Sequence, residues 1–170
     1  MMNQHLTTAL NNQVNAEYYS AYLYLSMSAC AEHLGFKGAA HWLFAQAQEE
    51  MAHGTNMYRY ILERGSKPSF AEINVPPSDF SDLRQIFEMV LEHEQYVTKR
   101  ISDIATMAMQ TNDHACYQFI MWYVNEQVEE ESSASDILNQ AQMIGDNTGL
   151  LLSLDKELGA RVFVNPFPDM

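Results

Sequence analysis

Four long segments of the chain share an amphipathic pattern in which inward positions recur alternately three and four residues apart. This spacing is typical of a bundle helix, whose apolar stripe packs against its neighbours. It predicts helices over about residues 3–33, 37–64 and 82–109, and a fourth from a capped break at 111–113 to residue 144. We therefore expect an all-α fold, a four-helix bundle over about residues 3–144 of a single domain spanning 1–170.

The connections between these helices differ in length, and this difference sets the topology. Gly35 separates the first two helices by a short turn, and Gly65 is a suitable C-terminal cap for the second. The segment 66–81 contains Pro68, Pro76 and Pro77, which exclude a continuous helix. A connection of this length can cross the whole bundle, so we expect the second and third helices to run parallel.

A leucine-rich stretch follows the fourth helix and predicts a short fifth helix over about residues 147–159, with its leucines between Leu150 and Leu158. Two interpretations remain open. The helix packs on the end of its own bundle, or neighbouring subunits cover its apolar surface. The tail 162–168 is also unusually apolar for a chain end, and its role is not apparent from the sequence.

The apolar stripes are interrupted at one height, near the midpoint of each of the four helices. Carboxylates, an imidazole and carboxamides take the inward positions there: Glu17, Gln46, Glu50, His53, Glu94, Gln127 and Glu130. The midpoints of bundle helices coincide whichever way each helix runs, so we expect these groups to converge. Any one of them alone would more often be a solvated glutamate or a satisfied core histidine. Their common height in all four helices favours a site.

A convergence of four carboxylates in a bundle core indicates metal binding. Ionised carboxylates repel one another and lose hydration on burial, at a cost of several kcal/mol per ion. No Lys or Arg occupies a mid-height stripe position to pair with them, which leaves protons or metal ions. Two divalent cations would balance Glu17, Glu50, Glu94 and Glu130, and His53 lies one turn from Glu50. Oxygen donors with one imidazole suit iron or manganese, although zinc also binds such ligands.

The charge of the chain restricts its partners. Lys and Arg number 9 and Asp and Glu 22, for a formal net charge of −13, and no basic run occurs. We expect no nucleic-acid binding, which needs a basic face, and an acidic surface that attracts cations. Cys30 and Cys116 form neither a CxxC motif nor a disulfide framework, which indicates a reducing cytoplasm. No signal-type or membrane-spanning apolar run is present, so we expect no membrane association.

Several motifs resemble those of the ferritins, and specifically of the bacterial non-haem ferritins. They extend over nearly the whole chain, in the order Glu17-Tyr18-Tyr19, Tyr24, Gln48-Glu49-Glu50-Met51-x-His53, Glu94, Gln118-Phe119-x-x-Trp122-Tyr123-Val124-x-Glu126-Gln127 and Glu129-Glu130-Glu131. The resemblance implies a ferritin-like bundle with a ferroxidase centre, at which dioxygen or hydrogen peroxide oxidises Fe(II). It also implies storage of Fe(III) as a mineral inside a homo-oligomeric cage of 24 subunits.

The resemblance further implies a dinuclear arrangement of the mid-height ligands. Glu17, Glu50 and His53 would hold one iron. Glu50, Glu94 and Glu130 would hold the other, so that Glu50 bridges the two.

Five more residues receive roles from the same resemblance. Gln127 would lie beside the centre as a polar neighbour, and Tyr24 would have a redox-active or supporting role rather than that of an ordinary core tyrosine. Glu49, Glu126 and Glu129 would build a third iron site that shares Glu130. Glu126 lies three and four residues from Glu129 and Glu130, hence on one helix face, although a solvated acidic patch would have the same spacing.

Two departures refine the resemblance. Gln127-x-x-Glu130 stands where bacterioferritins carry a second Glu-x-x-His motif, which favours the non-haem branch. Met51 follows Glu50 as the haem-ligating methionine does in bacterioferritins. We expect no haem, because a methionine on a mostly apolar helix usually packs, but a haem-binding ferritin stays open. The ligand pattern would also suit a di-iron oxidase or peroxidase without storage, or a structural helical assembly that binds a stabilising divalent ion.

Overall fold

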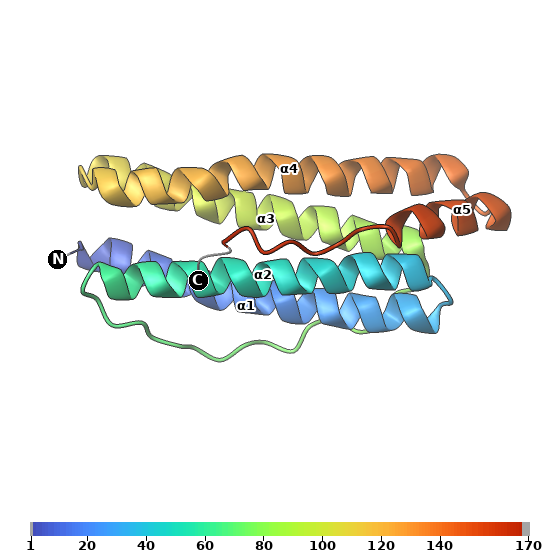
Figure 1. Cartoon of the computed structure of the whole chain (residues 1–170), viewed down its shortest axis with the longest axis horizontal. Coiled ribbons are helices and arrows are strands. Elements are labelled where there is room, and N and C mark those ends of the chain that lie inside the picture. The colour runs from blue at the N-terminus through green and yellow to red at the C-terminus, as the bar shows by residue number, and fades with distance from the viewer. Residues whose placement is uncertain (1, 168–170) are drawn as a thin grey trace.

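The computed structural model describes residues 2–167, so both ends of the predicted 1–170 domain lie outside the described residues. Within this range the chain forms helices and no strands. The helices are α1 (Gln4–His33), α2 (Lys37–Glu63), α3 (Leu83–Gln110), α4 (His114–Ile144) and α5 (Thr148–Leu158) (Figure 1). The predicted all-α four-helix bundle with a short fifth helix is confirmed, and the helix ends lie within a few residues of those expected.

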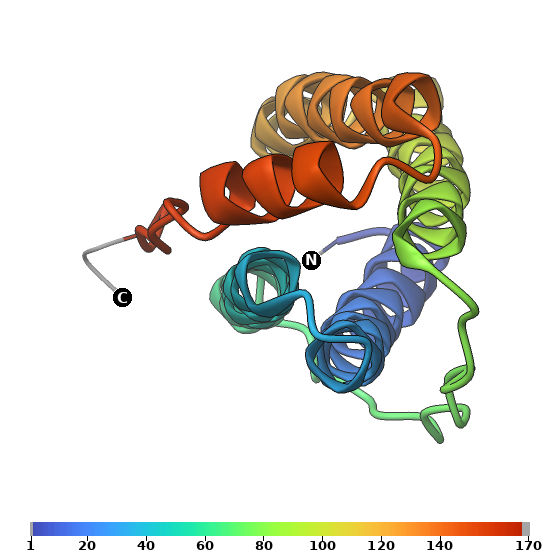
Figure 2. The ribbon, with the colours of Figure 1, turned by 90° about the vertical axis from the view of Figure 1, so that its right-hand side faces the viewer.

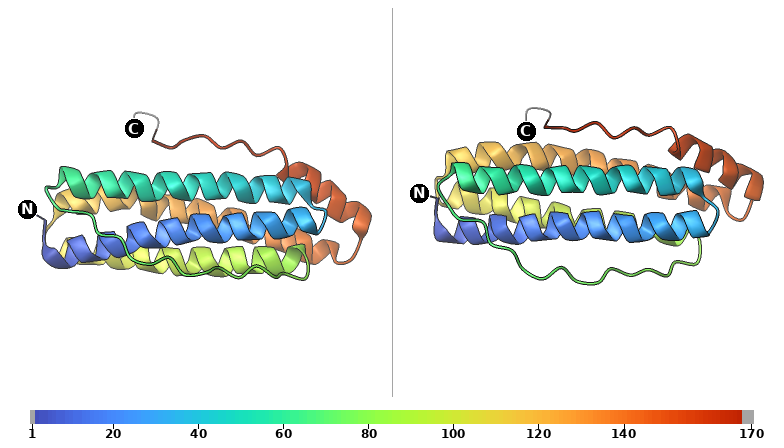
Figure 3. Two further views of the ribbon diagram at one scale, coloured as in Figure 1. Left: turned by 90° about the horizontal axis from the view of Figure 1, so that it is seen from below. Right: turned by 60° about the horizontal axis from the view of Figure 1, so that its bottom comes forward.

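The four long helices form two antiparallel pairs, α1 with α2 and α3 with α4, and α1 also packs against α3. The segment 64–82 crosses the length of the bundle, so α2 and α3 run parallel as predicted (Figures 1 and 3). The wide side of the bundle lies between α2 and α4, whose Cα atoms nowhere approach within 8 Å in the described residues. Helix α5 bridges this side at one end (Figure 2).

The helix ends are fixed by side-chain caps and by glycine. Asp82 begins α3 and accepts a hydrogen bond from the Gln85 backbone N–H at 3.0 Å. Asp113 begins α4 in the same way, with the Cys116 N–H as donor at 3.0 Å. Gly65 follows α2 with a φ of +71°, in the left-handed region that favours glycine. These signals explain why the boundaries could be read from the sequence.

The inward stripes are buried almost without exception. Three inward positions near helix ends are partly exposed, Ser28 on α1, Tyr60 on α2 and Ile144 on α4. The buried apolar residues form two clusters, one around Tyr24, Leu43 and Phe87 and one around Leu10, Met57 and Ile101. The mid-height polar residues lie between these clusters. None of the described helices combines the length and apolarity that a membrane span needs.

Helix α5 packs on its own bundle, against α2 and α4. Its Leu154 and Leu158 are buried, and the Asp155 carboxylate accepts a hydrogen bond from the Ala39 N–H in the first turn of α2 at 2.8 Å. Gly38 permits this approach, because a Cβ atom there would lie 1.6 Å from the Asp155 carbonyl oxygen. The structure therefore shows the packing on its own bundle that the first of the two interpretations expects. Leu150 and Leu152 nevertheless stay about half exposed, which leaves apolar surface for a neighbour.

Candidate metal centre

The mid-height residues form a buried polar layer that receives side chains from all four long helices. Glu94 is fully buried, and Glu17, Glu50, His53 and Glu130 are exposed by 6% or less. Glu17 comes from α1, Glu50 and His53 from α2, Glu94 from α3 and Glu130 from α4. The structure thus buries all five side chains inside the bundle, with at least one from each long helix.

Three of these side chains form a compact group, which we call the inner trio: Glu17, Glu50 and His53. One donor atom from each lies within 4.8 Å of the others. His53 Nδ1 is 3.4 Å from Glu50 Oε2, yet the two atoms are not aligned for a hydrogen bond. Their spacing is suited to three ligands around one cation.

Three buried side-chain atoms of the polar layer have no hydrogen-bond partner among the described residues: Gln46 Oε1, Glu50 Oε2 and His53 Nε2. A buried polar atom without a partner costs about 1–3 kcal/mol, and more when it carries charge. Two of the three atoms belong to the inner trio. Hard carboxylate oxygens with one imidazole are the donor set expected for iron or manganese, so the residues present fit such an ion.

Glu94 and Glu130 are held by neighbouring amides and a phenol. The Tyr24 hydroxyl donates to Glu94 Oε1, and Gln127 Nε2 donates to Glu94 Oε2 at 3.0 Å. Gln46 Nε2 donates to Glu130 Oε2 at 2.7 Å. The structure does not gather Glu94 and Glu130 into a group as tight as the inner trio. Tyr24 and Gln127, predicted to support the centre, both contact Glu94 directly.

Burial shifts the protonation of the layer toward neutral groups. Desolvation, with the neighbouring Glu17 and Glu94 charges, raises the pKa of Glu50 well above its usual range. The pKa of Glu94 rises to about 7, chiefly through burial. Burial lowers the pKa of His53, which keeps the imidazole neutral and able to act as a ligand. A cation entering the layer would therefore displace protons from the carboxyl groups.

A second group of donors, the outer trio, lies at the wide side of the bundle and consists of Glu49, His53 and Glu126. One donor atom from each lies within 4.8 Å of the others. Burial and the charges of Glu49 and Glu129 raise the pKa of Glu126. Glu129 is exposed and is not part of this group. Of the predicted third-site residues, the structure brings Glu49 and Glu126 together beside His53 and leaves Glu129 at the surface.

Two residues that the sequence did not single out support Glu17. Gln13 Nε2 donates to Glu17 Oε1 at 2.8 Å, and Arg100 Nε donates to Gln13 Oε1 at 2.8 Å. Gln13 lies one helical turn before Glu17 but off the apolar stripe, so only the i, i+4 spacing could have indicated it. Arg100 orients the Gln13 amide that donates to Glu17, without itself lying among the carboxylates.

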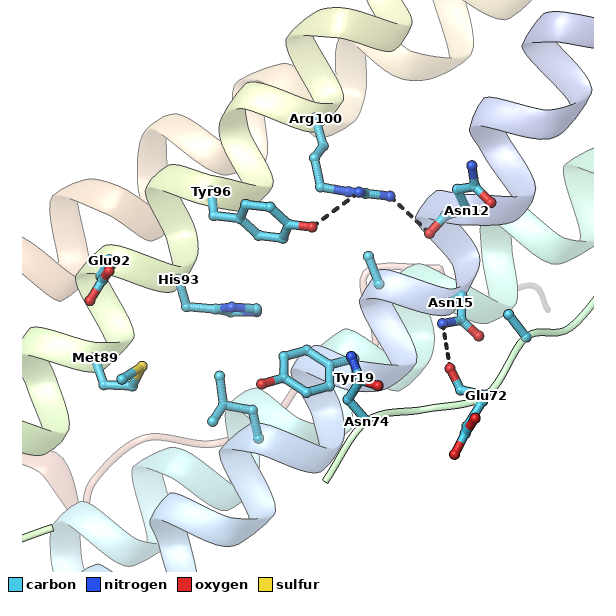
Figure 4. Close-up of a pocket in the computed structure, with 13 residues that line it drawn as sticks. Asn12, Asn15, Tyr19, Glu72, Asn74, Met89, Glu92, His93, Tyr96 and Arg100 are labelled. Carbon is cyan, nitrogen blue, oxygen red and sulfur yellow. Dashed lines mark hydrogen bonds between the residues drawn. The ribbon is translucent and has the colours of Figure 1, made fainter. Parts of the chain in front are cut away.

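A cavity of about 590 Å³ lies on the other side of this support, between α1, α3 and the crossover (Figure 4). Arg100 donates hydrogen bonds across it to the Asn12 carbonyl and, along its own helix, to the Tyr96 hydroxyl. His93 borders the cavity, accepts or donates a 2.7 Å hydrogen bond with Ser20, and has its pKa lowered to about 4 by burial. The cavity contains none of the inner or outer trio, so it is separate from the candidate centre.

Trp122 and Met51, which belong to the motifs found in the sequence, differ in their distance from the polar layer. The Trp122 ring is 5.4 Å from the His53 ring, which places this indole beside the inner trio. Met51 is half exposed on α2 and does not face the polar layer.

The sequence and the fold both have close counterparts among known proteins. Residues 7–144 match the family described as a ferritin-like domain. The chain is 39% identical to a bacterial non-heme ferritin of Staphylococcus aureus over 96% of this chain and 98% of that protein. It is 35% identical to a probable bacterial non-heme ferritin-like protein of Haemophilus influenzae, over 94% and 96% of the two chains.

Solved ferritin structures are similar over almost the whole chain. An open pore ferritin from the archaeon Archaeoglobus fulgidus matches with a TM-score of 0.93 and 46% identity, covering 95% of this chain and 98% of that one. A humanized archaeal ferritin matches with a TM-score of 0.95 and 46% identity, over 96% and 99% of the two chains. Together with the buried carboxylate layer and the matching bundle, these similarities show that the chain belongs to the ferritin family.

Proposed function

We propose that the protein is an iron-storage ferritin that oxidises Fe(II) at a dinuclear centre within each subunit. The observation that carries this proposal is the polar layer itself. Four glutamates and one histidine from four helices are buried at one height, and Glu50 and His53 present donor atoms without a partner among the described residues. Such groups oppose folding unless protons or a cation compensate them, and the unpartnered donor atoms favour a cation.

The proposed ligands divide into two sets that share Glu50. Glu17, Glu50 and His53, the inner trio, would bind one Fe(II). Glu50, Glu94 and Glu130 would bind the second, and all three of these side chains are buried in the same layer. Gln127 and Gln46 hold the Glu94 and Glu130 carboxylates from the side, so these ligands are oriented before iron arrives.

The chemistry of the layer suits oxidation of a bound iron pair. Two Fe(II) ions together supply two electrons, enough to reduce dioxygen to hydrogen peroxide or hydrogen peroxide to water. Hard anionic oxygen donors favour the ferric product, and Tyr24 offers a buried phenol hydrogen-bonded to Glu94. Burial and nearby carboxylates raise the pKa of Tyr24, so the phenol keeps its proton until it loses an electron.

Storage would follow from release of Fe(III) toward the wide side of the bundle. The outer trio, which includes His53, lies there, and we propose that Glu49 and Glu126, with Glu129 nearby, form a third site on the way out. A homo-oligomeric cage around a mineral is proposed by analogy with the related ferritins. Exposed Leu150 and Leu152 on α5 supply apolar surface for a contact between subunits.

Stopped-flow oxidation at about two Fe(II) per subunit tests the centre. We expect Glu50→Ala to slow the fast phase of oxidation more than any other single ligand change. The loss should be about 10- to 100-fold or more, since changes to residues that merely support a metal ligand already cost that much. His53→Ala should mainly weaken one of the two sites. Glu88→Ala, which removes an exposed carboxylate from α3, is the matched control and should oxidise iron like the parent. A normal rate in Glu50→Ala would contradict the dinuclear assignment.

Iron loading separates storage from an oxidase or a purely structural function. A ferritin accumulates many iron atoms per subunit under repeated aerobic additions, whereas a di-iron oxidase or a structural assembly keeps only the few that its ligands hold. Glu49→Ala, Glu126→Ala and Glu129→Ala should retain first-turnover oxidation but change the iron-to-oxygen stoichiometry or later turnovers. If all three variants load iron as the parent does, these residues are only an acidic surface.

A further inference from the structure

The segment that follows α5, residues 160–167, returns along the wide side of the bundle between α2 and α4 (Figures 1 and 2). We call it the C-terminal segment. Near its start, the Arg161 carbonyl accepts a hydrogen bond from His41 Nε2 at 2.8 Å. The segment thus begins on α2, the helix that carries Glu49, Glu50 and His53.

Arg161 places its guanidinium directly on the outer trio. Its Nη2 lies 2.5 Å from Glu49 Oε2, and its central carbon lies 4.7 Å from the centre of the Trp42 ring. The Arg161 and Glu49 side chains are exposed by only 24% and 15%, so water screens this ion pair less than a surface pair. A guanidinium stays protonated at any physiological pH, and Glu49 therefore has a permanent counter-ion.

The other end of the C-terminal segment is held by aromatic contacts. The Phe167 ring lies 4.5 Å from the Trp122 ring and 6.3 Å from the His53 ring. Between the two anchored ends, Val162 and Val164 are about three-quarters exposed. The segment therefore contacts members of the outer trio near both of its ends, Glu49 through Arg161 and His53 through Phe167, whereas Val162 and Val164 between them are exposed.

These contacts set the segment in competition with a metal ion. A cation bound by Glu49, His53 and Glu126 would use the same Glu49 carboxylate that the Arg161 guanidinium contacts. His53 makes this a ligand site and not only an acidic patch, since it is 2% exposed and its Nε2 has no partner among the described residues. Two positive charges would share one carboxylate unless the guanidinium moved away.

We propose that the C-terminal segment is a displaceable cap on the outer trio, with Arg161 as the built-in counter-ion that an incoming cation must displace and Phe167 as its second anchor. This inference rests on the proposed third iron site. The cap lowers the affinity of that site while it is closed. It also gives a role to Phe167 of the apolar tail, because this phenyl ring packs beside Trp122 and His53.

Terbium(III) titration of the assembled, metal-free protein tests the cap, with tryptophan-sensitised luminescence as the readout. Terbium(III) is a hard trivalent ion that prefers carboxylate oxygen, and Trp42 and Trp122 lie next to the site. One part of the titration curve should be lost in Glu126→Ala, and it reports binding at the outer trio. At this site Arg161→Ala should bind terbium about tenfold more tightly than the parent, a change of about 1.4 kcal/mol. Arg161→Lys, which keeps the charge, should stay closer to the parent.

Two controls separate the cap from bulk charge. Arg59→Ala also removes one positive charge, from an exposed position ten residues beyond Glu49 on α2 and so about 15 Å away, and should leave the affinity unchanged. Phe167→Ala should tighten binding as Arg161→Ala does. Val164→Ala, an exposed change in the same segment, should not. Equal affinities in Arg161→Ala and the parent, or an equal gain in Arg59→Ala, would overturn the cap.

The Glu126→Ala variant distinguishes failure of the cap from failure of the site. If a terbium-binding component disappears in Glu126→Ala but has the same affinity in Arg161→Ala as in the parent, the third site stands and the cap is wrong. If no component depends on Glu126 in either the parent or the Arg161→Ala background, the third site is wrong and the cap falls with it.

Discussion

Glu50 is a buried carboxylate in an unfavourable environment. It is 2% exposed, surrounded by other carboxylates, and one of its oxygens has no hydrogen-bond partner among the described residues. The neighbouring glutamates differ, because Glu17, Glu94 and Glu130 each accept a hydrogen bond from a glutamine. The residue proposed to bridge two irons is thus the one that the protein itself satisfies least.

Glu94 gives the metal-free protein a pH-dependent stability with a definite sign. Its pKa is raised from 4.5 to about 7 in the folded state. The folded form therefore retains a proton that the unfolded chain releases above about pH 4.5, and this contribution is full below that pH and lost as the pH rises to about 7. We expect Glu94→Gln to be more stable than the parent by about 1–3 kcal/mol at pH 8, with a smaller difference at pH 5.

Urea unfolding in the presence of a chelator measures this difference at the two pH values. Glu88→Gln is the control, because Glu88 is exposed on the same helix and its substitution should have the same small effect at both. A Glu94→Gln difference that does not change between pH 5 and pH 8 would show that Glu94 titrates like an exposed carboxylate.

The sequence predicted the ligands of the layer better than their supports. Glu17, Glu50, His53, Glu94 and Glu130 interrupt apolar stripes, and a periodic pattern makes such interruptions visible. Gln13 is also buried, but it lies off the stripe on a helix with a wide inward face, so the pattern gave no reason to select it. Arg161 follows the last helix, where no periodicity relates it to Glu49.

At the scale of elements, the close approach of α1 and α2 positions the inner trio. A Cβ atom on Gly54 would lie 2.7 Å from the Tyr18 ring and 3.2 Å from Glu17 Cβ. Gly54 therefore lets α1 bring Glu17 against the face of α2 that carries Glu50 and His53. This glycine is conformationally ordinary, and its role is to leave room for the neighbouring helix.

Gly54→Ala should consequently destabilise the protein by about 1–3 kcal/mol, despite the higher helix propensity of alanine, because α1 must shift. It should also slow Fe(II) oxidation, since Glu17 moves with the helix. Thermal melts and stopped-flow oxidation measure the two effects. Gly149→Ala is the control, because a Cβ atom there meets only the Asn147 side-chain oxygen at 3.5 Å. A Gly54→Ala protein as stable and as active as the parent would contradict this role.

Asp155 ties α5 to the start of α2. Asp155 supplies the side-chain cap that Phe36, the residue before α2, does not. We expect Asp155→Ala to cost about 1 kcal/mol and to loosen α5, whereas Glu157→Ala, which removes an exposed carboxylate from the same helix, should cost much less. Hydrogen exchange of residues 148–158 measures the loosening. Unchanged protection in Asp155→Ala would mean that Leu154 and Leu158 alone hold α5.

The sequence predicted the crossover between α2 and α3, but not the positions of α5 and the C-terminal segment. The sequence was enough to predict the crossover and the parallel α2 and α3. Prolines in segment 66–81 exclude a continuous helix, and the segment is long enough to cross the bundle. The dock of α5 on its own bundle was left open, since it depends on Gly38 and Asp155 meeting across more than a hundred residues. The C-terminal segment was not predicted at all, because its few contacts are set by tertiary structure.

At the scale of the whole molecule, the bundle consists of two apolar cores separated by a charged layer. Each core joins all four long helices, one above and one below the candidate centre. The cores hold the helices together while the layer between them carries groups that oppose folding in the absence of a cation. Metal binding should therefore stabilise the folded protein, through release of protons and pairing of charge.

Truncation after Gly145 tests how α5 contributes to assembly. The four long helices retain both halves of their core without it, so circular dichroism should show a folded bundle. The half-exposed Leu150 and Leu152 would be lost, and we expect light scattering to report a smaller or weaker assembly with less iron retained. A truncated protein that assembles and retains iron like the full chain would show that α5 is not a subunit contact. A monomeric full-length protein would contradict storage in a cage.

The dinuclear centre can be tested most directly by anomalous diffraction at the iron absorption edge, from crystals supplied with about two Fe(II) per subunit. The account predicts two peaks inside the bundle, one bounded by Glu17, Glu50 and His53 and one by Glu50, Glu94 and Glu130, with Glu50 contacting both. Loss of both peaks in Glu50→Ala crystals, with the bundle intact, would complete the assignment. A single peak between the helices, or iron found only at the exposed acidic surface, would contradict it.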